Sequence, residues 1–279
     1  MKIELAGITF NDTGRGWVFA DLIDWYSLPD SKAESVPMPQ AHGSFNPGTD
    51  WRTAAVPSFT AGYIGSSKAE CLAAVEAFTA IGASQAVMSV TDELRTTRRE
   101  VSVRHIGVPD FFGYEDFEVH FAVDLLAWDP IRYGDEVSVS TGLPQSGGRL
   151  EYPLGTPSGA LYYGSNGTLG RVTLTNPGNA DIWPSFLVTS TLTSGFFIQR
   201  LDDGSVLRYD RVVPSGSTVS IDSRTGRVLV DGQSDGSTYL TRDQFFAVPA
   251  LSSIEVQFNA ISGSSGSPEL TATMRPGWW

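Results

Sequence analysis

The chain has 279 residues, of which 41% are hydrophobic and 18% charged, and its formal net charge is -12. A chain of this length buries roughly 75% of its unfolded surface, so it needs no disulfide or structural metal to fold. The single cysteine, Cys71, excludes an internal disulfide framework and a cysteine-based zinc site. The acidic balance, without any cluster of Lys and Arg, argues against a nucleic-acid-binding surface.

The first residues do not form a targeting segment. Glu4 and Gly7 interrupt the apolar residues that follow Met1, which excludes the apolar core of a signal peptide. No stretch approaches the roughly 20 apolar residues that a membrane span requires. We therefore expect a protein that is made in a cytoplasm and has no membrane anchor.

The N-terminal half begins with strands and a long connection. Residues 2–10 and 17–26 are predicted strands, and residues 51–65 form a third. Residues 27–50 lie between them as a polar loop that contains four prolines and two glycines. Because connections of this length are uncommon in compact domains, they are usually functional or disordered.

A single helix is predicted at residues 67–82. Ser67 is followed three residues later by Glu70, which is the spacing of a capping box. An apolar stripe at helical spacing follows, and Gly82 stands where a left-handed C-terminal cap is expected. The stripe consists of Cys71, Leu72, Val75 and Phe78. This amphipathic helix is expected to cover the apolar face of a sheet.

Three more strands are predicted after the helix, at residues 85–92, 98–107 and 115–127. The last has a period of two, with apolar residues at Phe117, Val119, Phe121, Val123 and Leu125. Such alternation indicates one buried face and one solvated face.

A change in composition divides the chain. From Ser138 to Gly170 the chain is dominated by Gly, Ser, Thr and Pro, which is typical of a linker. We predict an N-terminal domain at 1–137, a linker at 138–150 and a C-terminal domain at 151–279.

The C-terminal half is predicted to be entirely β. Short strands separated by Gly-, Asn- and Asp-rich turns indicate a β-sandwich or jelly roll. The predicted strands lie at 169–176, 184–191, 195–201, 204–211, 217–222, 226–231, 238–248, 253–260 and 268–275.

No catalytic or metal-binding constellation is present in the sequence. The three histidines, His42, His105 and His120, lie neither beside a nucleophile motif nor at metal-ligand spacing. An acidic group, which includes Glu118 and Asp124, fits the solvated face of a strand better than a pair of catalytic carboxylates. The other members of this group are Asp110, Glu115 and Asp116. We therefore predict no enzymatic activity and no cofactor.

Three further features have ordinary structural interpretations. The Asp202-Asp203-Gly204 segment lacks the other ligands of a calcium loop and is predicted to be a turn. Cys71 is predicted to be a small buried core residue. The C-terminal half is also rich in aromatic residues, most of which are expected in the core, although exposed rings on a sandwich can bind sugars. These residues are Tyr162, Tyr163, Trp183, Phe196, Phe197, Tyr209 and Tyr239, and Trp278-Trp279 are expected to dock on their own domain or on a partner.

Several local segments occur in a characteristic order and spacing. In the C-terminal half these are Leu174–Pro184, which contains the Asn176-Pro177-Gly178-Asn179 turn, then Val219–Val228 with Asp231-Gly232, and Asp243–Pro249. In the N-terminal half they are His42-Gly43-Ser44 and Trp51-Arg52. Together these segments resemble the distal tail protein (Dit) family of siphophages, particularly the minor tail proteins of phages of actinobacteria. The first segment is the best match, and the two in the N-terminal half match more loosely.

The resemblance implies an adaptor at the tip of the phage tail. It implies an N-terminal β-barrel-like domain with one helix that forms a homohexameric ring, and a C-terminal galectin-like or jelly-roll β-sandwich that projects outward. Its implied partners are the tail tube protein, the tail hub or fibre protein and the tape measure protein. Genome DNA only passes through the ring, and an acidic lumen would repel its phosphates.

A second interpretation is a carbohydrate- or host-receptor-binding β-sandwich module, for which host-wall glycan would be the ligand. The two interpretations are compatible if the outward sandwich touches the host wall. A glycoside hydrolase on a jelly-roll scaffold is the third, and it would require two carboxylates facing each other across a cleft.

Overall fold

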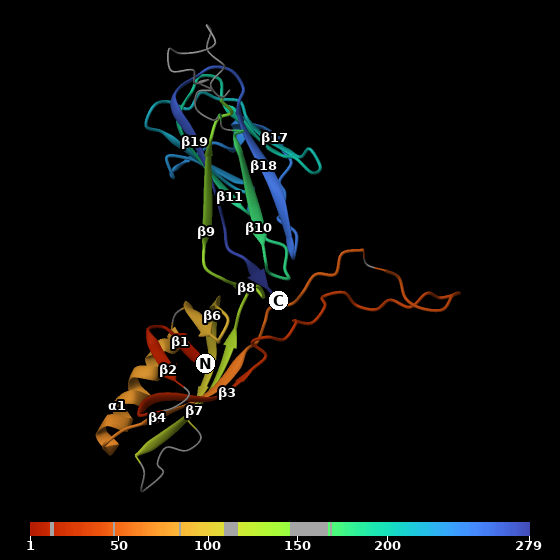
Figure 1. The fold of residues 1–279 in the computed structure, drawn as a ribbon. Helices are drawn as coiled ribbons and strands as arrows, with labels where there is room; N and C mark the ends of the chain where they lie inside the picture. Colours follow the sequence, from red (N-terminus) through yellow and green to blue (C-terminus); the bar gives the residue numbers. More distant parts are fainter. Residues whose placement is uncertain (12–13, 47, 84, 109–116, 146–166, 168) are drawn as a thin grey trace, which may run out of the picture. The chain divides into compact units, whose positions relative to one another are not determined.

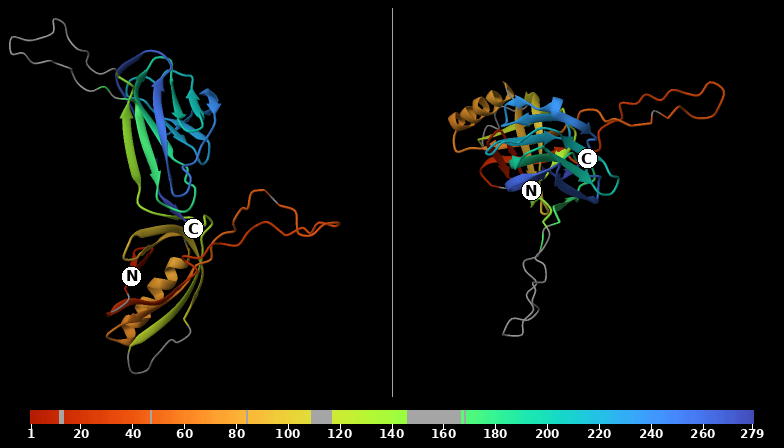
Figure 2. Two further views of the ribbon diagram at one scale, coloured as in Figure 1. Left: turned by 45° about the vertical axis from the view of Figure 1, so that its right-hand side comes forward. Right: turned by 90° about the horizontal axis from the view of Figure 1, so that it is seen from above.

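The computed structural model contains strands in both halves of the chain (Figures 1 and 2). It describes residues 1–11, 14–46, 48–83, 85–108, 117–145, 167 and 169–279. The chain divides into two units. The first, which we call the barrel unit, comprises Met1–Asp135 together with Trp278–Trp279, and the second, the sandwich unit, comprises Glu136–Gly277.

In the described part of the barrel unit, seven strands form a closed barrel in the order β6-β5-β1-β2-β3-β4-β7, because β7 also pairs with β6. β8 and then β20 extend this sheet beyond β6. The pairings within the barrel and that of β6 with β8 are antiparallel, except β2 with β3, which are parallel at Asn11 and Val18. The strands are β1 (Lys2–Leu5), β2 (Ile8–Asn11), β3 (Gly16–Ile23), β4 (Ser58–Ile64), β5 (Gln85–Thr91), β6 (Thr96–Gly107), β7 (Glu118–Leu126), β8 (Arg132–Tyr133) and β20 (Gly277–Trp278).

The core of the barrel unit is a cluster of aromatic rings. Phe78 of helix α1 (Lys68–Thr79) lies 4.9 Å from Phe121 of β7 and 5.6 Å from Phe10 of β2, centroid to centroid. Trp17 and Phe59 complete the cluster at similar distances. Most of these contacts have the edge-to-face geometry that aromatic pairs prefer. The predicted alternation of β7 is confirmed for Val119, Phe121, Val123 and Leu125, whereas Phe117 precedes the strand and is 38% exposed.

Helix α1 begins as predicted, and its capping box is modified. The Ser67 side chain accepts a hydrogen bond from the Glu70 N–H, but the Glu70 carboxylate accepts from the backbone and hydroxyl of Ser66 instead of from Ser67. The predicted apolar stripe was wrong at Leu72, which is 44% exposed, because Ala74 takes the buried position beside Cys71 and Phe78.

Two other local predictions were corrected. Gly82 is not a left-handed cap, since the helix continues into a 3-10 turn at Ala80–Ala83. The predicted strand at 2–10 is a hairpin, because Ala6 and Gly7 adopt φ values of 49° and 84° and turn the chain between β1 and β2. A left-handed backbone of this kind suits a tight turn and ends a strand.

The sandwich unit consists of two antiparallel sheets in its described residues. Five strands follow the order β10-β18-β12-β13-β17, and six follow β16-β15-β14-β11-β19-β9. The alternating burial of β10 and β11 places every second side chain in the core between the sheets, as expected of a sandwich. The strands are β9 (Val137–Gly142), β10 (Arg171–Asn176), β11 (Ser185–Leu192), β12 (Phe196–Arg200), β13 (Val206–Tyr209), β14 (Thr218–Asp222), β15 (Arg227–Val230), β16 (Ser234–Asp235), β17 (Leu240–Asp243), β18 (Ser252–Ala260) and β19 (Ser264–Met274), with a short 3-10 turn at Ser237–Tyr239.

The connection between β10 and β11, residues 176–184, is held by hydrogen bonds from the buried Asn176 side chain. We call it the Asn176 loop. Asn176 is 1% exposed. Its amide donates to the carbonyl oxygens of Ala180 (2.7 Å) and Val248 (3.3 Å), and its side-chain oxygen accepts from the Gly178 N–H at 3.0 Å. Gly178 packs so closely that a Cβ there would lie 1.8 Å from the Gly277 carbonyl oxygen. Asn176 is therefore explained by the hydrogen bonds of its buried side chain, and Gly178 by the close approach of the Gly277 backbone.

The predicted linker at 138–150 begins with a strand. Residues 138–142 belong to β9, which pairs antiparallel with β19 from Val137↔Met274 to Gly142↔Glu269. The run of Ser, Thr and Gly concealed this strand, since its pairing partner lies more than 120 residues away. Residues 146–150 and the predicted start of the C-terminal domain at 151 lie outside the described residues. No helix among the described residues is long and apolar enough to cross a membrane.

Candidate assembly surface

A two-limbed extension leaves the barrel unit between β3 and β4 (Figures 1 and 2). We call residues 24–57 the arm. Backbone hydrogen bonds join its two limbs, from Lys32 N–H to the Trp51 carbonyl at 2.7 Å and from Phe45 N–H to the Val36 carbonyl at 2.9 Å. Near the tip, the Met38 N–H donates to the Gly43 carbonyl at 3.0 Å. The arm is thus an irregular hairpin and has internal order.

The root of the arm is fixed to the barrel. Trp25 is fully buried and its indole N–H donates to the Thr97 hydroxyl at 3.2 Å. On the other limb, Ala55 and Ala127 exchange backbone hydrogen bonds of 3.0 and 2.8 Å. Both limbs therefore start from positions that are set by the barrel.

A buried arginine supports the same root. Arg99 donates to the Trp25 carbonyl at 3.1 Å and to the Pro130 carbonyl at 2.6 Å, and its guanidinium lies over the Trp25 ring at 5.1 Å. Burial, together with the nearby charge of Arg132, lowers the pKa of Arg99 to about 10. It therefore remains charged at neutral pH and holds the root through charge-assisted hydrogen bonds.

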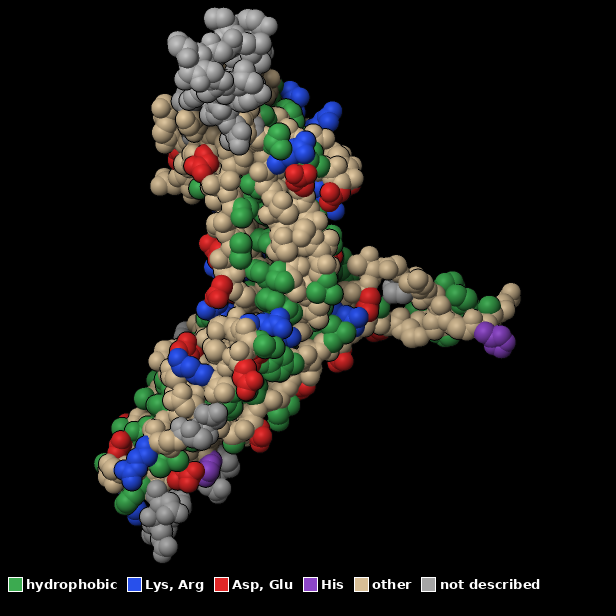
Figure 3. All heavy atoms as spheres, in the orientation of Figure 1, with side chains coloured by type: hydrophobic (Ala, Val, Ile, Leu, Met, Phe, Trp, Pro, Cys, Tyr) green, Lys and Arg blue, Asp and Glu red, His purple; other side chains and the backbone are tan. Residues whose placement is uncertain are grey.

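Beyond the root, the arm exposes large apolar side chains. Trp51 is 70% exposed, and Leu28, Val36 and Phe45 are each more than half exposed. In the space-filling view, hydrophobic side chains are visible along the arm (Figure 3). Several exposed apolar groups on one ordered extension indicate a surface that a partner covers.

The predicted candidates for catalysis are dispersed. His42 lies exposed in the arm, His105 on β6 and His120 on β7, where its Nε2 is 3.7 Å from a Glu118 carboxylate oxygen. Glu118 and Asp124 lie on β7, whereas Asp110, Glu115 and Asp116 lie outside the described residues. No group of three or more His, Cys, Asp or Glu that could hold a metal occurs in the described part of the chain.

Cys71, Asp202 and Asp203 have the structural roles predicted for them, whereas Trp278 and Trp279 belong to the barrel unit and not to their own predicted domain at 151–279. Cys71 is 2% exposed and its thiol donates to the Phe117 carbonyl at 3.0 Å. Asp202 and Asp203 form the β12–β13 turn, where the Asp203 carboxylate accepts from the Ser205 N–H. Trp278 lies on β20 in the barrel unit, with the Arg95 guanidinium 4.6 Å from its ring.

The aromatic residues of the sandwich unit divide between core and surface. Phe196 and Tyr209 are buried and stack at 5.4 Å, whereas Trp183 is 43% exposed and Phe197 is partly buried. Tyr239 is partly buried and meets Tyr209 edge-on at 6.1 Å. Tyr162 and Tyr163 lie outside the described residues.

The sequence analysis identified the long loop but not its organisation. It assigned residues 51–57 to a strand, whereas they form the returning limb of the arm, and β4 begins only at Ser58. The available signal was the placement of Val36, Phe45 and Trp51 among prolines and glycines, where apolar residues have no local core to fill.

No family model and no curated protein matches this sequence. Solved structures do match. The Dit protein (gp 19.1) of phage SPP1, described as a hub of the adsorption apparatus of phages that infect Gram-positive hosts, aligns with a TM-score of 0.70 at 12% identity, over 100% of this chain and 99% of that one. Chains of the phage p2 baseplate in its activated conformation, with Ca or with Sr, align with TM-scores of 0.55 and 0.54 at 11% identity, over 98% of this chain and 97% of theirs. The chain therefore has, over its whole length, the fold of a phage distal tail protein.

Proposed function

We propose that the protein is a structural component of a phage tail tip, a ring-forming distal tail adaptor that joins the tail tube to the hub or receptor-binding apparatus. It acts without catalysis and without a cofactor. It resides in the virion after synthesis in the host cytoplasm.

The observation that carries this proposal is the length of the structural match. The SPP1 protein aligns over 100% of this chain, so that barrel, helix and sandwich all take part in the match. A match to one β-sandwich alone would carry little weight, because sandwiches serve many functions.

The arm supplies a surface for a neighbouring copy. A closed ring uses a heterologous interface, in which one surface of each subunit covers a different surface of the next. The arm has a fixed root and an apolar outer part, which includes Phe45 and Trp51. Aromatic side chains of this kind dominate binding energy at interfaces. We therefore assign the arm to the contact between successive subunits.

The remaining partners follow from the same role. The tail tube protein would bind one face of the ring, the hub or fibre protein the other, and the tape measure protein would meet the lumen. Genome DNA would pass through without binding, which is consistent with a net charge of -12.

Light scattering and negative-stain electron microscopy of the purified protein test the proposal. We expect rings with a central channel and a mass six times the 30.0 kDa of the chain. The double variant Phe45→Ser/Trp51→Ser is expected to remain folded and to lose the rings. Leu94→Ser is the matched control, since Leu94 is 84% exposed on the turn between β5 and β6, outside the arm.

If the wild-type protein is a monomer, the tail tube and hub proteins of the same phage are added. Failure to form a ring in their presence would overturn the adaptor. Rings that persist in the double variant would contradict the role of the arm.

A further inference from the structure

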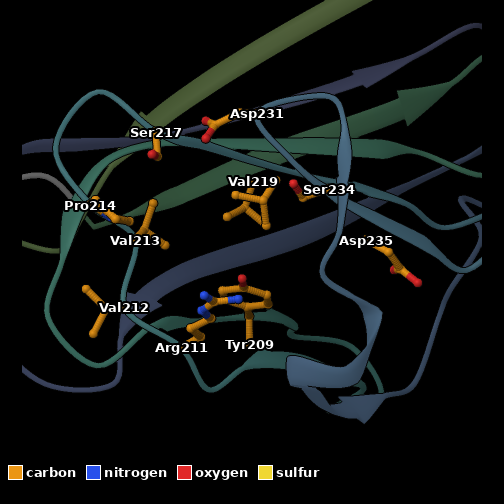
Figure 4. A pocket seen from close by; sticks show the side chains of 11 residues that line it. Tyr209, Arg211, Val212, Val213, Pro214, Ser217, Val219, Asp231, Ser234 and Asp235 are labelled. Carbon is orange, nitrogen blue, oxygen red and sulfur yellow. The ribbon is translucent and has the colours of Figure 1, made fainter.

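A pocket lies in the sandwich unit, between its two sheets (Figure 4). It encloses about 240 Å³. Tyr209 of β13 comes from one sheet and Val219 of β14 from the other, while Arg211 and Ser217 come from the connection between these strands. Asp231, at the end of β15, closes another side. Sites for drug-sized ligands measure roughly 300–1,000 Å³, so this pocket suits a single small ring.

The floor of the pocket carries an unusual polar group. Tyr209 is 1% exposed, and among the described residues its hydroxyl has no hydrogen-bond partner. In Figure 4 this hydroxyl points into the pocket, toward Val219. Buried hydroxyl groups are normally paired, because an unpaired one costs the energy of its lost hydration. The hydroxyl keeps a small accessible surface inside the pocket, so a water molecule pairs with it in the free protein and a ligand hydroxyl or ring oxygen can replace that water.

Arg211 provides a second unused donor. Arg211 is an exposed residue, and its guanidinium stacks over the Tyr239 ring at 4.2 Å from the ring centroid. In the described part of the chain it has no carboxylate within ion-pair distance. Its N–H groups therefore remain available to a ligand oxygen.

Acceptors lie on the opposite side. One carboxylate oxygen of Asp231 accepts the Thr218 N–H at 2.8 Å, which orients the group. The hydroxyls of Ser217 and Ser234 line the pocket near it. Asp235 also borders the pocket, but it accepts from the Ser237 N–H and its carboxylate lies away from Tyr209 in Figure 4.

We propose that this pocket binds a neutral sugar ring of a glycan. Tyr209 and Arg211 would donate to its oxygens, Asp231 would accept from its hydroxyls, and Val213 and Val219, each 1% exposed, would pack against its C–H face. This mixture of donors, acceptors and apolar surface is the chemistry that a polyhydroxylated ring presents.

Other small ligands fit less well. A phosphate or carboxylate could pair with Arg211, but in a pocket of about 240 Å³ it would also meet the carboxylates of Asp231 and Asp235, and these two like charges outnumber the one guanidinium. A purely apolar ligand would leave the Tyr209 hydroxyl unpaired. Burial raises the pKa of Tyr209, so the hydroxyl stays protonated and acts as a donor at neutral pH.

Saturation-transfer NMR on the full-length protein tests the site. The probes are the methyl glycosides of glucose, galactose, rhamnose and N-acetylglucosamine, with inorganic phosphate as the charged comparison. We expect at least one glycoside to bind with a millimolar Kd and phosphate to bind more weakly. The proposal does not depend on ring formation, since the pocket lies within one chain.

Two substitutions locate the binding. Tyr209→Phe removes only the hydroxyl and is expected to weaken glycoside binding about tenfold, and Arg211→Ala at least as much. Tyr63→Phe, which removes a hydroxyl in the barrel unit, is the matched control and leaves binding unchanged.

A thermal melt separates binding from folding. Because no described residue of the free protein pairs with the Tyr209 hydroxyl, Tyr209→Phe is expected to be at least as stable as the wild type. A less stable variant would mean that the hydroxyl has a structural role. The proposal is also overturned if no glycoside binds, if phosphate binds more tightly, or if binding survives in both pocket variants.

Discussion

The arm and the Asn176 loop both connect neighbouring strands in sequence, and they use their side chains in opposite ways. The Asn176 loop buries a polar side chain and satisfies it within the unit. The arm exposes Trp51, Phe45 and other apolar side chains that contribute nothing to the core. Burial of apolar surface is the main stabilising term in folding. Under the proposed function, these exposed side chains are the surface that a neighbouring subunit would cover.

The comparison also separates two reasons for an unusual loop sequence. Asn176 and Gly178 are required by the fold itself, through hydrogen bonds and close packing. Trp51 is not required by the fold, since it is 70% exposed. Mutations in the first loop are expected to change stability, and mutations in the second to change assembly.

The largest effect is expected from Gly178→Ala. The new Cβ would lie 1.8 Å from the Gly277 carbonyl oxygen, and a backbone atom cannot move aside as a flexible side chain can. We expect a loss of about 3 kcal/mol or more in the free energy of unfolding of the sandwich unit. Urea denaturation measures it.

Gly142→Ala is the control in the same unit. Its added Cβ would make an ordinary contact of 3.6 Å with the Pro268 carbonyl oxygen, so the change is expected to stay within about 0.5 kcal/mol. Equal stabilities for the two variants would show that the Asn176 loop tolerates substitution. The difference proposed between this loop and the arm would then be wrong.

Two tryptophans of the arm sharpen the contrast within one connection. Trp25 at the root is fully buried, whereas Trp51 is 70% exposed. Trp25→Ala is expected to cost about 3–5 kcal/mol in stability through the cavity it leaves. Trp51→Ala is expected to change stability by less than about 0.5 kcal/mol and to weaken the association of subunits. Thermal denaturation and analytical ultracentrifugation, applied to both variants, distinguish these effects.

A stable Trp51→Ala variant that assembles like the wild type would remove the main support for a partner on the arm. A strongly destabilised Trp51→Ala variant would instead mean that the arm folds back on its own unit in solution.

Sequence reasoning succeeded where a structure is determined by neighbouring residues. The alternation from Val119 to Leu125 predicted a strand with one buried face, and Ser67 predicted the start of the helix. The β content of both units followed from the same local patterns.

It failed where distant residues decide the outcome. The closure of the barrel depends on the pairing of β6 with β7, and β9 exists because β19 lies beside it. The pocket likewise requires Tyr209 from one sheet and Val219 from the other, so the sequence marked Tyr209 only as one aromatic residue among several. Trp51 was assigned to a strand because aromatic residues are common in strands, but it pairs with the other limb of the arm, through the Lys32 N–H, and not with a strand of the barrel.

The smallest predicted effect concerns a third connection, between β4 and α1. As in the Asn176 loop, a polar side chain of the same unit, here Glu70, forms hydrogen bonds that hold the connection. Hydrogen bonds from Ser66, and then one from Tyr63, lower the pKa of Glu70 from its ordinary value of 4.5 to about 2. A carboxylate with a depressed pKa stabilises the fold fully above pH 4.5, and this contribution is lost as the pH falls toward 2.

Glu70→Gln is therefore expected to lower the melting temperature at neutral pH by a small amount, and the gap to the wild type is expected to close as the pH approaches 2. Melting curves across this range measure the gap, with Glu76→Gln, an exposed position on the same helix, as the control. A gap that stays constant with pH would mean that the ionised Glu70 carboxylate does not hold this connection. Stabilisation of a connection by a polar side chain of its own unit would then apply to the Asn176 loop of the sandwich unit and not to the barrel unit.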